Sequence, residues 1–136
     1  MKKLVVLTAL LVMDSITFAE SFQEAVARYE YVQNEADYML YKTKSATWSD
    51  EEIGALIACY SFCYQAFEDV SNRGPGLSEQ DRHKYRLFSL TCKMQHDNLF
   101  SKAEQFSAYT RQRISASLDK WYKHLCDGGS ITFNRR

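Results

Sequence analysis

The segment SDEEIGALIACYSFCYQAFEDVSNRGPGLS, residues 49–78, determines the fold class of this 136-residue chain. Its apolar residues recur every three or four positions, which predicts a buried helix over residues 50–70. Ser49 with Glu52 three residues later has the pattern of a capping box, so the helix should begin at Asp50. The loop Ser71–Ser78 contains Gly74-Pro75-Gly76, the strongest helix-breaking run in the chain, and should end it. The residues expected to face inward are Ile53, Leu56, Ile57, Tyr60, Cys63, Tyr64, Phe67 and Val70.

Helical spacing continues upstream of this segment. Apolar residues at steps of three and four predict a first helix over residues 21–42, followed by a loop over residues 43–49. The stripe of this helix consists of Phe22, Val26, Tyr29, Val32, Ala36 and Met39 or Leu40.

Downstream, Ser78 and the acidic turn behind it predict the start of a third helix. Ser101 with Glu104 predicts a break near Asp97–Ser101, and Gly128-Gly129 should end a fourth helix. The inward stripe of this region is expected to be Phe88, Cys92, Gln95, Leu99, Ala103, Phe106, Ile114, Leu118, Trp121 and Leu125. The sequence therefore predicts one all-α domain over residues 20–129, an antiparallel bundle of about four helices. Residues 130–136 form a short tail that we expect to fray, with Ile131 and Phe133 as the residues able to dock.

Residues 1–19 have the pattern of a cleavable secretory signal. Lys2 and Lys3 precede an apolar stretch, and Thr17-Phe18-Ala19 provides a cleavage site before Glu20. The apolar stretch is too short for a membrane span, so we expect a periplasmic protein without stable membrane anchoring. Removing Lys2, Lys3 and Asp14 leaves 15 of the 17 basic residues and 16 of the 17 acidic ones. This balance excludes the basic excess typical of nucleic-acid binding.

The four cysteines, Cys59, Cys63, Cys92 and Cys126, are an even number in a chain expected to reach an oxidising compartment. A helical hairpin centred on Pro75 would place Cys59 opposite Cys92. This favours the disulfides Cys59–Cys92 and Cys63–Cys126. The alternative, Cys63–Cys92 with Cys59–Cys126, requires a slide of only one helical turn. Two disulfides would thus staple the bundle.

No catalytic motif occurs in the sequence, and none of its patterns requires a cofactor. We therefore expect a protein that is not an enzyme. Cys59-x3-Cys63 with Cys92-x3-His96 is a pattern able to bind zinc. Because an exported chain favours disulfides over structural zinc, we expect no metal site.

Aromatic residues exceed what a core of this size can bury. The chain has nine tyrosines and eight phenylalanines, and the tyrosines fall on several helix faces. Tyrosine is favoured at protein interfaces because one end is apolar and the other accepts water. The surplus favours a protein partner or a homodimer.

The plan of the chain resembles the periplasmic immunity proteins of type VI secretion systems. The resemblance rests on the signal Met1–Ala19, the mature length, the helical pattern and the four cysteines. It implies a protein that neutralises a secreted toxin, such as a cell-wall-degrading effector, by steric occlusion of its active site. The rival hypotheses are a carrier of small apolar ligands and a secreted helical enzyme.

Two segments are candidates for contacting such a toxin. One is the acidic start of the second helix, because enzymes that act on the cell wall often have basic grooves. The other is the loop over residues 71–78, which we expect to protrude between flanks braced by disulfides. The predicted contact residues are Asp50, Glu51, Glu52, Asn72, Arg73, Gly74 and Pro75.

Overall fold

The computed structural model describes residues 21–136 as four α-helices, with no strand in that part of the chain. The helices are α2 (Phe22–Lys42), α3 (Asp50–Arg73), α4 (Glu79–Ala103) and α5 (Ala108–Cys126), with a short 3₁₀ helix η1 (Ser45–Thr47) before α3. This confirms the predicted all-α class. The predicted signal over residues 1–19 lies outside the described residues.

A serine caps the N-terminus of each α-helix. The hydroxyls of Ser21, Ser49, Ser78 and Ser107 each accept a hydrogen bond from a backbone N–H in the first turn. The capping box of Ser49 with Glu52 is complete, as predicted. These caps satisfy backbone donors that have no partner within the helix, which is why the helices begin where they do.

The predicted break near Asp97–Ser101 is wrong. α4 continues to Ala103, and Ser107 rather than Ser101 caps the next helix. Leu99 and Ala103 are both buried, so continuing the helix keeps two apolar side chains in the core.

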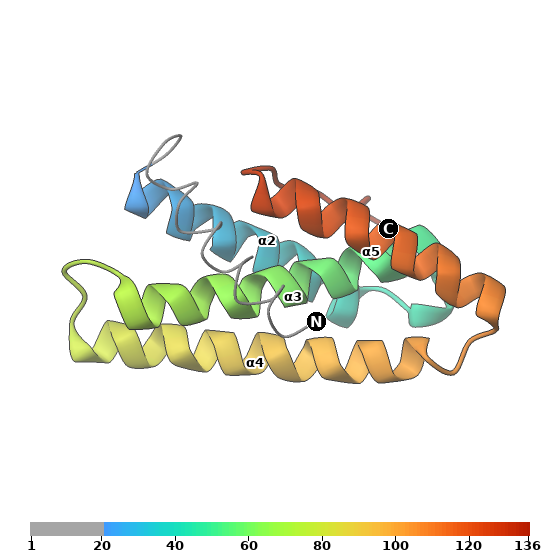
Figure 1. Cartoon of the computed structure of the whole chain (residues 1–136), viewed down its shortest axis with the longest axis horizontal. Coiled ribbons are helices and arrows are strands. Elements are labelled where there is room, and N and C mark those ends of the chain that lie inside the picture. Colours follow the sequence, from blue (N-terminus) through green and yellow to red (C-terminus); the bar gives the residue numbers. More distant parts are fainter. Residues whose placement is uncertain (1–20) are drawn as a thin grey trace.

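α3 lies at the centre of the molecule and has more buried residues than any of the other three α-helices. Figure 1 shows α4 along one side of α3 and both α2 and α5 along the other, and consecutive helices run in opposite directions. α3 and α5 therefore run parallel where they pack together. Eleven hydrophobic side chains of α3 are buried: Ala55, Leu56, Ile57, Ala58, Cys59, Tyr60, Phe62, Cys63, Ala66, Phe67 and Val70. A helix that is apolar on most of its circumference is expected at such a position.

The crossing of α3 and α5 depends on Gly54. A Cβ atom at this position would lie 2.4 Å from the carbonyl oxygen of Ile114 and 2.7 Å from the Cβ of Ser117. The Ser117 hydroxyl donates a 2.6 Å hydrogen bond to the carbonyl oxygen of Glu51, which holds the two helices together one turn earlier. Only glycine permits this approach of the two backbones.

The C-terminal segment does not fray, contrary to the prediction. Ile131 and Phe133 are buried, and the backbone N–H of Phe133 donates a 2.8 Å hydrogen bond to the carboxylate of Glu35. The guanidinium of Arg135 forms an ion pair with the same carboxylate and lies 3.9 Å from the centre of the Tyr38 ring. Glu35 is only 4% exposed. Its charge is therefore satisfied by the last residues of the chain, which pack along α2.

Candidate functional site

The four cysteines are free thiols, and all four are buried. Neither Cys59–Cys92 nor Cys63–Cys126 is formed, so the prediction of a bundle stapled by these two disulfides is wrong. α3 continues to Arg73, beyond the predicted end, and the Ser89 hydroxyl donates to the carbonyl of Tyr64 across the hairpin. This register places Cys92 nearest to Cys63, one turn from its predicted partner.

The thiol environment is apolar. Burial raises the pKa of the Cys63 thiol well above its usual range, and a hydrogen-bond contact with Cys92 adds to the shift. The Cys63 thiol also lies 3.7 Å from the carbonyl oxygen of Tyr29. Burial raises the pKa of Cys126 to about 11. Thiols held in the neutral form are poor nucleophiles, so this cluster contributes to packing rather than to chemistry at neutral pH.

The zinc pattern does not converge. Cys92 points into the core, whereas the His96 ring stacks on Phe100 and its Nδ1 lies 3.0 Å from Asp97. Within residues 21–136, no group of three or more histidine, cysteine or acidic side chains is arranged to hold a metal ion.

The predicted acidic contact residues at the start of α3 are paired with cations of α5. Asp50 lies 3.1 Å from the guanidinium of Arg113, and Glu51 lies 3.3 Å from the ammonium of Lys120. Both ion pairs are partly exposed and therefore contribute little to the stability of the fold. They nevertheless neutralise the acidic surface, so electrostatic attraction to a basic groove is weaker than the sequence suggests.

Glu52 has a structural role. Its carboxylate completes the capping box with Ser49 and forms an ion pair with Arg136. The hydrogen bond from Arg136, followed by those from Ser49, lowers the pKa of Glu52. The backbone N–H of Arg136 also donates to the Tyr38 hydroxyl at 2.8 Å. This predicted contact residue therefore holds the end of the chain in place.

The predicted contact loop lies at the opposite end of α3. The guanidinium of Arg82 holds this loop by donating hydrogen bonds to the carbonyl oxygens of Ser71 at 2.9 Å and Gly74 at 3.3 Å. Gly76 has a φ of +69°, a conformation that favours glycine. Of the four contact residues predicted in this loop, Gly74 is buried, and the exposed ones are Asn72, Arg73 and Pro75. Hydrogen bonds from Arg82, and not disulfides, brace this loop.

Asp69 lies next to this loop and makes the protein's stability depend on pH. Burial raises the pKa of Asp69 to about 6, although its ion pair with Arg73 at 3.6 Å partly opposes the shift. The folded-state pKa is above the unfolded value of about 3.9, so the folded protein loses stability as pH rises from about 4 to 6.

We expect Asp69→Asn to stabilise the protein at pH 7 by about 1–2 kcal/mol, a range reduced because the group is partly hydrated. The gain should vanish below about pH 4, where the native carboxyl is also neutral. Urea denaturation at pH 3.5, 5 and 7 measures the difference. A gain that is equal at all three pH values would show that charge burial at Asp69 is not its cause.

A third surface, which the sequence did not reveal, lies at the turn between α4 and α5. We call Phe100, Phe106 and Tyr109 the aromatic end; their side chains are 45%, 45% and 68% exposed. Phe106 was predicted to face the core, but the helix ends before it. Asp50 and Phe106 line the same surface hollow, so this surface adjoins the predicted acidic site.

Arg113 links the acidic site to the aromatic end. Its guanidinium donates to the Tyr109 hydroxyl at 3.3 Å, lies 5.7 Å from the centre of the Tyr109 ring and pairs with Asp50. These contacts orient an exposed tyrosine that would otherwise be free to rotate, which lowers the entropic cost of binding.

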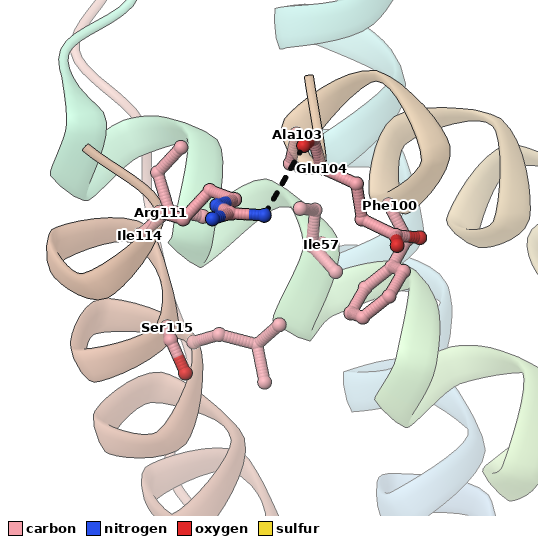
Figure 2. A pocket seen from close by; sticks show the side chains of 8 residues that line it. Ile57, Phe100, Ala103, Glu104, Arg111, Ile114 and Ser115 are labelled. Carbon is pink, nitrogen blue, oxygen red and sulfur yellow. Dashed lines mark hydrogen bonds between the residues drawn. The ribbon is translucent and has the colours of Figure 1, made fainter. Parts of the chain in front are cut away.

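An apolar pocket separates the last turn of α4 from α5 (Figure 2). Ile57, Ala103 and Ile114 are buried residues of its wall, and Arg111 donates to the carbonyl oxygen of Glu104 at 3.5 Å across the rim. Its volume of about 170 Å³ is below the roughly 300–1,000 Å³ of pockets that enclose drug-sized ligands. The remaining lining residues are Phe100, Ser115 and Leu118.

This pocket and the hollow beside Phe106 share Ala103, so an apolar recess lies on each side of the end of α4. Exposed aromatic side chains beside apolar recesses are typical of surfaces that bind proteins. This surface was not predicted because the break between α4 and α5 was expected near Ser101, before the true end of α4 at Ala103. The serine at position 107 was the signal that would have located it.

No helix within residues 21–136 is both long and apolar enough to cross a membrane. Comparison of the chain with protein-family models, with curated proteins and with solved structures gives no match.

Proposed function

We propose that this protein is an exported inhibitor that binds a secreted toxin, of the class that degrades the cell wall, and blocks its active site sterically. The observation that carries the proposal is the aromatic end, a group of three exposed aromatic side chains of which Phe106 lines a hollow together with Asp50. The export signal predicted over residues 1–19 places the protein in the periplasm, where such toxins act.

Occlusion requires a rigid projection rather than reactive groups. The aromatic end lies at one tip of the elongated molecule, at the turn between α4 and α5 (Figure 1). Large aromatic side chains dominate the binding energy of many interfaces, and at this tip they are able to enter a substrate groove.

The double variant Phe106→Ala/Tyr109→Ala tests the assignment. We expect it to lose the partner that the wild-type protein retains from a periplasmic extract, since each aromatic anchor is worth about tenfold or more in affinity. Quantitative mass spectrometry of the bound proteins gives the readout. Both side chains are exposed, so the melting temperature should change little.

Asn72→Ala/Arg73→Ala at the other end of α3 is the matched control. We expect this variant to retain the partner. Loss of the partner in this variant alone would move the binding site to the loop over residues 71–78, and retention in both variants would contradict both assignments.

A further inference from the structure

The outer face of α4 carries apolar side chains for which the described chain provides no neighbouring helix. Within residues 21–136, α4 packs chiefly against α3, and Figure 1 shows it along one edge of the molecule. Leu87, Leu90 and Met94 are 48%, 57% and 56% exposed. Their spacing of three and four residues places them on one stripe, which we call the α4 stripe.

The α4 stripe is bounded by a histidine at one end and an aspartate at the other. His83 lies four residues before Leu87, and Asp97 lies three residues after Met94, so both fall on the same line of the helix. Both are exposed. Within its own chain, Asp97 contacts His96 and Lys93.

A histidine at one end of the α4 stripe and an aspartate at the other make the stripe complementary to a second, antiparallel copy of itself. If the twofold axis passes between Leu90 and Thr91, Leu87 lies opposite Met94 of the second copy, and Leu90 lies within about 1.5 Å of its own counterpart along the helix axis. The same register brings His83 within one residue of the position opposite Asp97 of the second copy, at both ends of the apolar contact. We infer that the α4 stripe is a homodimer interface, with a second copy of this chain as its occupant.

One pair of charges opposes this arrangement and limits its strength. Arg86 and Lys93 lie on the same flank of the stripe and are both exposed. A twofold axis perpendicular to the helices brings Arg86 close to Lys93 of the second copy. The contact is also a single helix face, which is small for a stable interface. The dimer is therefore weak.

Sedimentation equilibrium on residues 20–136 tests the inference. We expect the wild-type protein to self-associate at concentrations up to about 0.5 mM, as befits a small interface. Leu90→Glu should weaken association by about tenfold or more, because it buries a charge at the centre. Phe106→Glu, an apolar-to-acidic change at the aromatic end, should leave association unchanged. A wild-type protein that remains monomeric throughout would overturn the inference.

Two further variants test the antiparallel register. Arg86→Glu replaces the repulsion with an attraction to Lys93 of the second copy and should tighten the dimer by about tenfold. Leu90→Cys should form a disulfide-linked dimer on oxidation, since the two positions differ by about 1.5 Å along the axis. Leu87→Cys should not, because its two copies are about 10 Å apart along the axis, beyond disulfide reach.

The four native cysteines are buried and should not compete. Crosslinking of Leu87→Cys as readily as Leu90→Cys would overturn the register. Loss of association in Phe106→Glu would move the interface to the aromatic end. Because toxin binding is assigned to that end, the dimer and the proposed function are able to fail separately.

Discussion

Replacing Gly54 by leucine is expected to lower the free energy of unfolding by about 3 kcal/mol. The side chain would have to occupy space in which even a Cβ lies 2.4 Å from the carbonyl oxygen of Ile114. A backbone atom in a helix is unable to rotate aside, so α3 and α5 must separate. Separation would also break the hydrogen bond from Ser117 to the carbonyl of Glu51.

Gly54→Ala should cost less, because alanine stabilises a helix by about 1 kcal/mol relative to glycine and offsets part of the clash. Chemical denaturation of both variants measures the free energies. Ala27→Leu, at an exposed position of α2, is the control for adding a leucine side chain and should change stability by less than about 0.5 kcal/mol. A Gly54→Leu protein as stable as the wild type would show that the two helices do not cross closely.

Removing the Arg135 guanidinium is expected to have the second largest effect, a loss of about 2–3 kcal/mol. Arg135→Ala leaves the carboxylate of Glu35 buried, with only the backbone N–H of Phe133 as a partner. An uncompensated buried charge typically costs 3–5 kcal/mol, and the partial exposure of Arg135 reduces this figure.

A double-mutant cycle separates the ion pair from other effects. In a Glu35→Gln background, Arg135→Ala should cost less than about 1 kcal/mol, because no charge remains to be orphaned. Arg86→Ala, which removes an exposed arginine from α4, serves as the control and should be close to neutral in dilute solution. Equal costs of Arg135→Ala in both backgrounds would mean that the last residues of the chain are not held by Glu35.

The helices were predictable because their signals are local. Ser49 with Glu52 and the glycines around Pro75 act within a few residues of where they occur. Apolar spacing identified five of the seven buried residues of α2, but only six of the fourteen buried residues of α3. The break between α4 and α5 offered two serine caps, Ser101 and Ser107. The pattern of Ser101 with Glu104 predicted the wrong one, because a local pattern does not show that Leu99 and Ala103 are buried.

The features that were missed depend on contacts between distant residues. From sequence alone, Glu35 has the pattern of an exposed polar residue on an amphipathic helix. Its role depends on its contact with Arg135, which lies one hundred residues later in the chain. The partner of Cys92 depends on a hairpin register that a shift of one turn changes. The aromatic end is the exception, because it was missed through the early placement of a local helix break: Phe106 is exposed because α4 ends at Ala103.

The binding proposal is tested most directly by the inhibition of a toxin. The measurement is peptidoglycan hydrolysis by the enzyme that the wild-type protein retains from a periplasmic extract, with increasing amounts of residues 20–136 added. We expect an equimolar amount of the wild-type protein to stop hydrolysis, and Phe106→Ala/Tyr109→Ala to require about a hundredfold more. Hydrolysis that continues at saturating wild-type protein, or a double variant as potent as the wild type, would contradict the proposal.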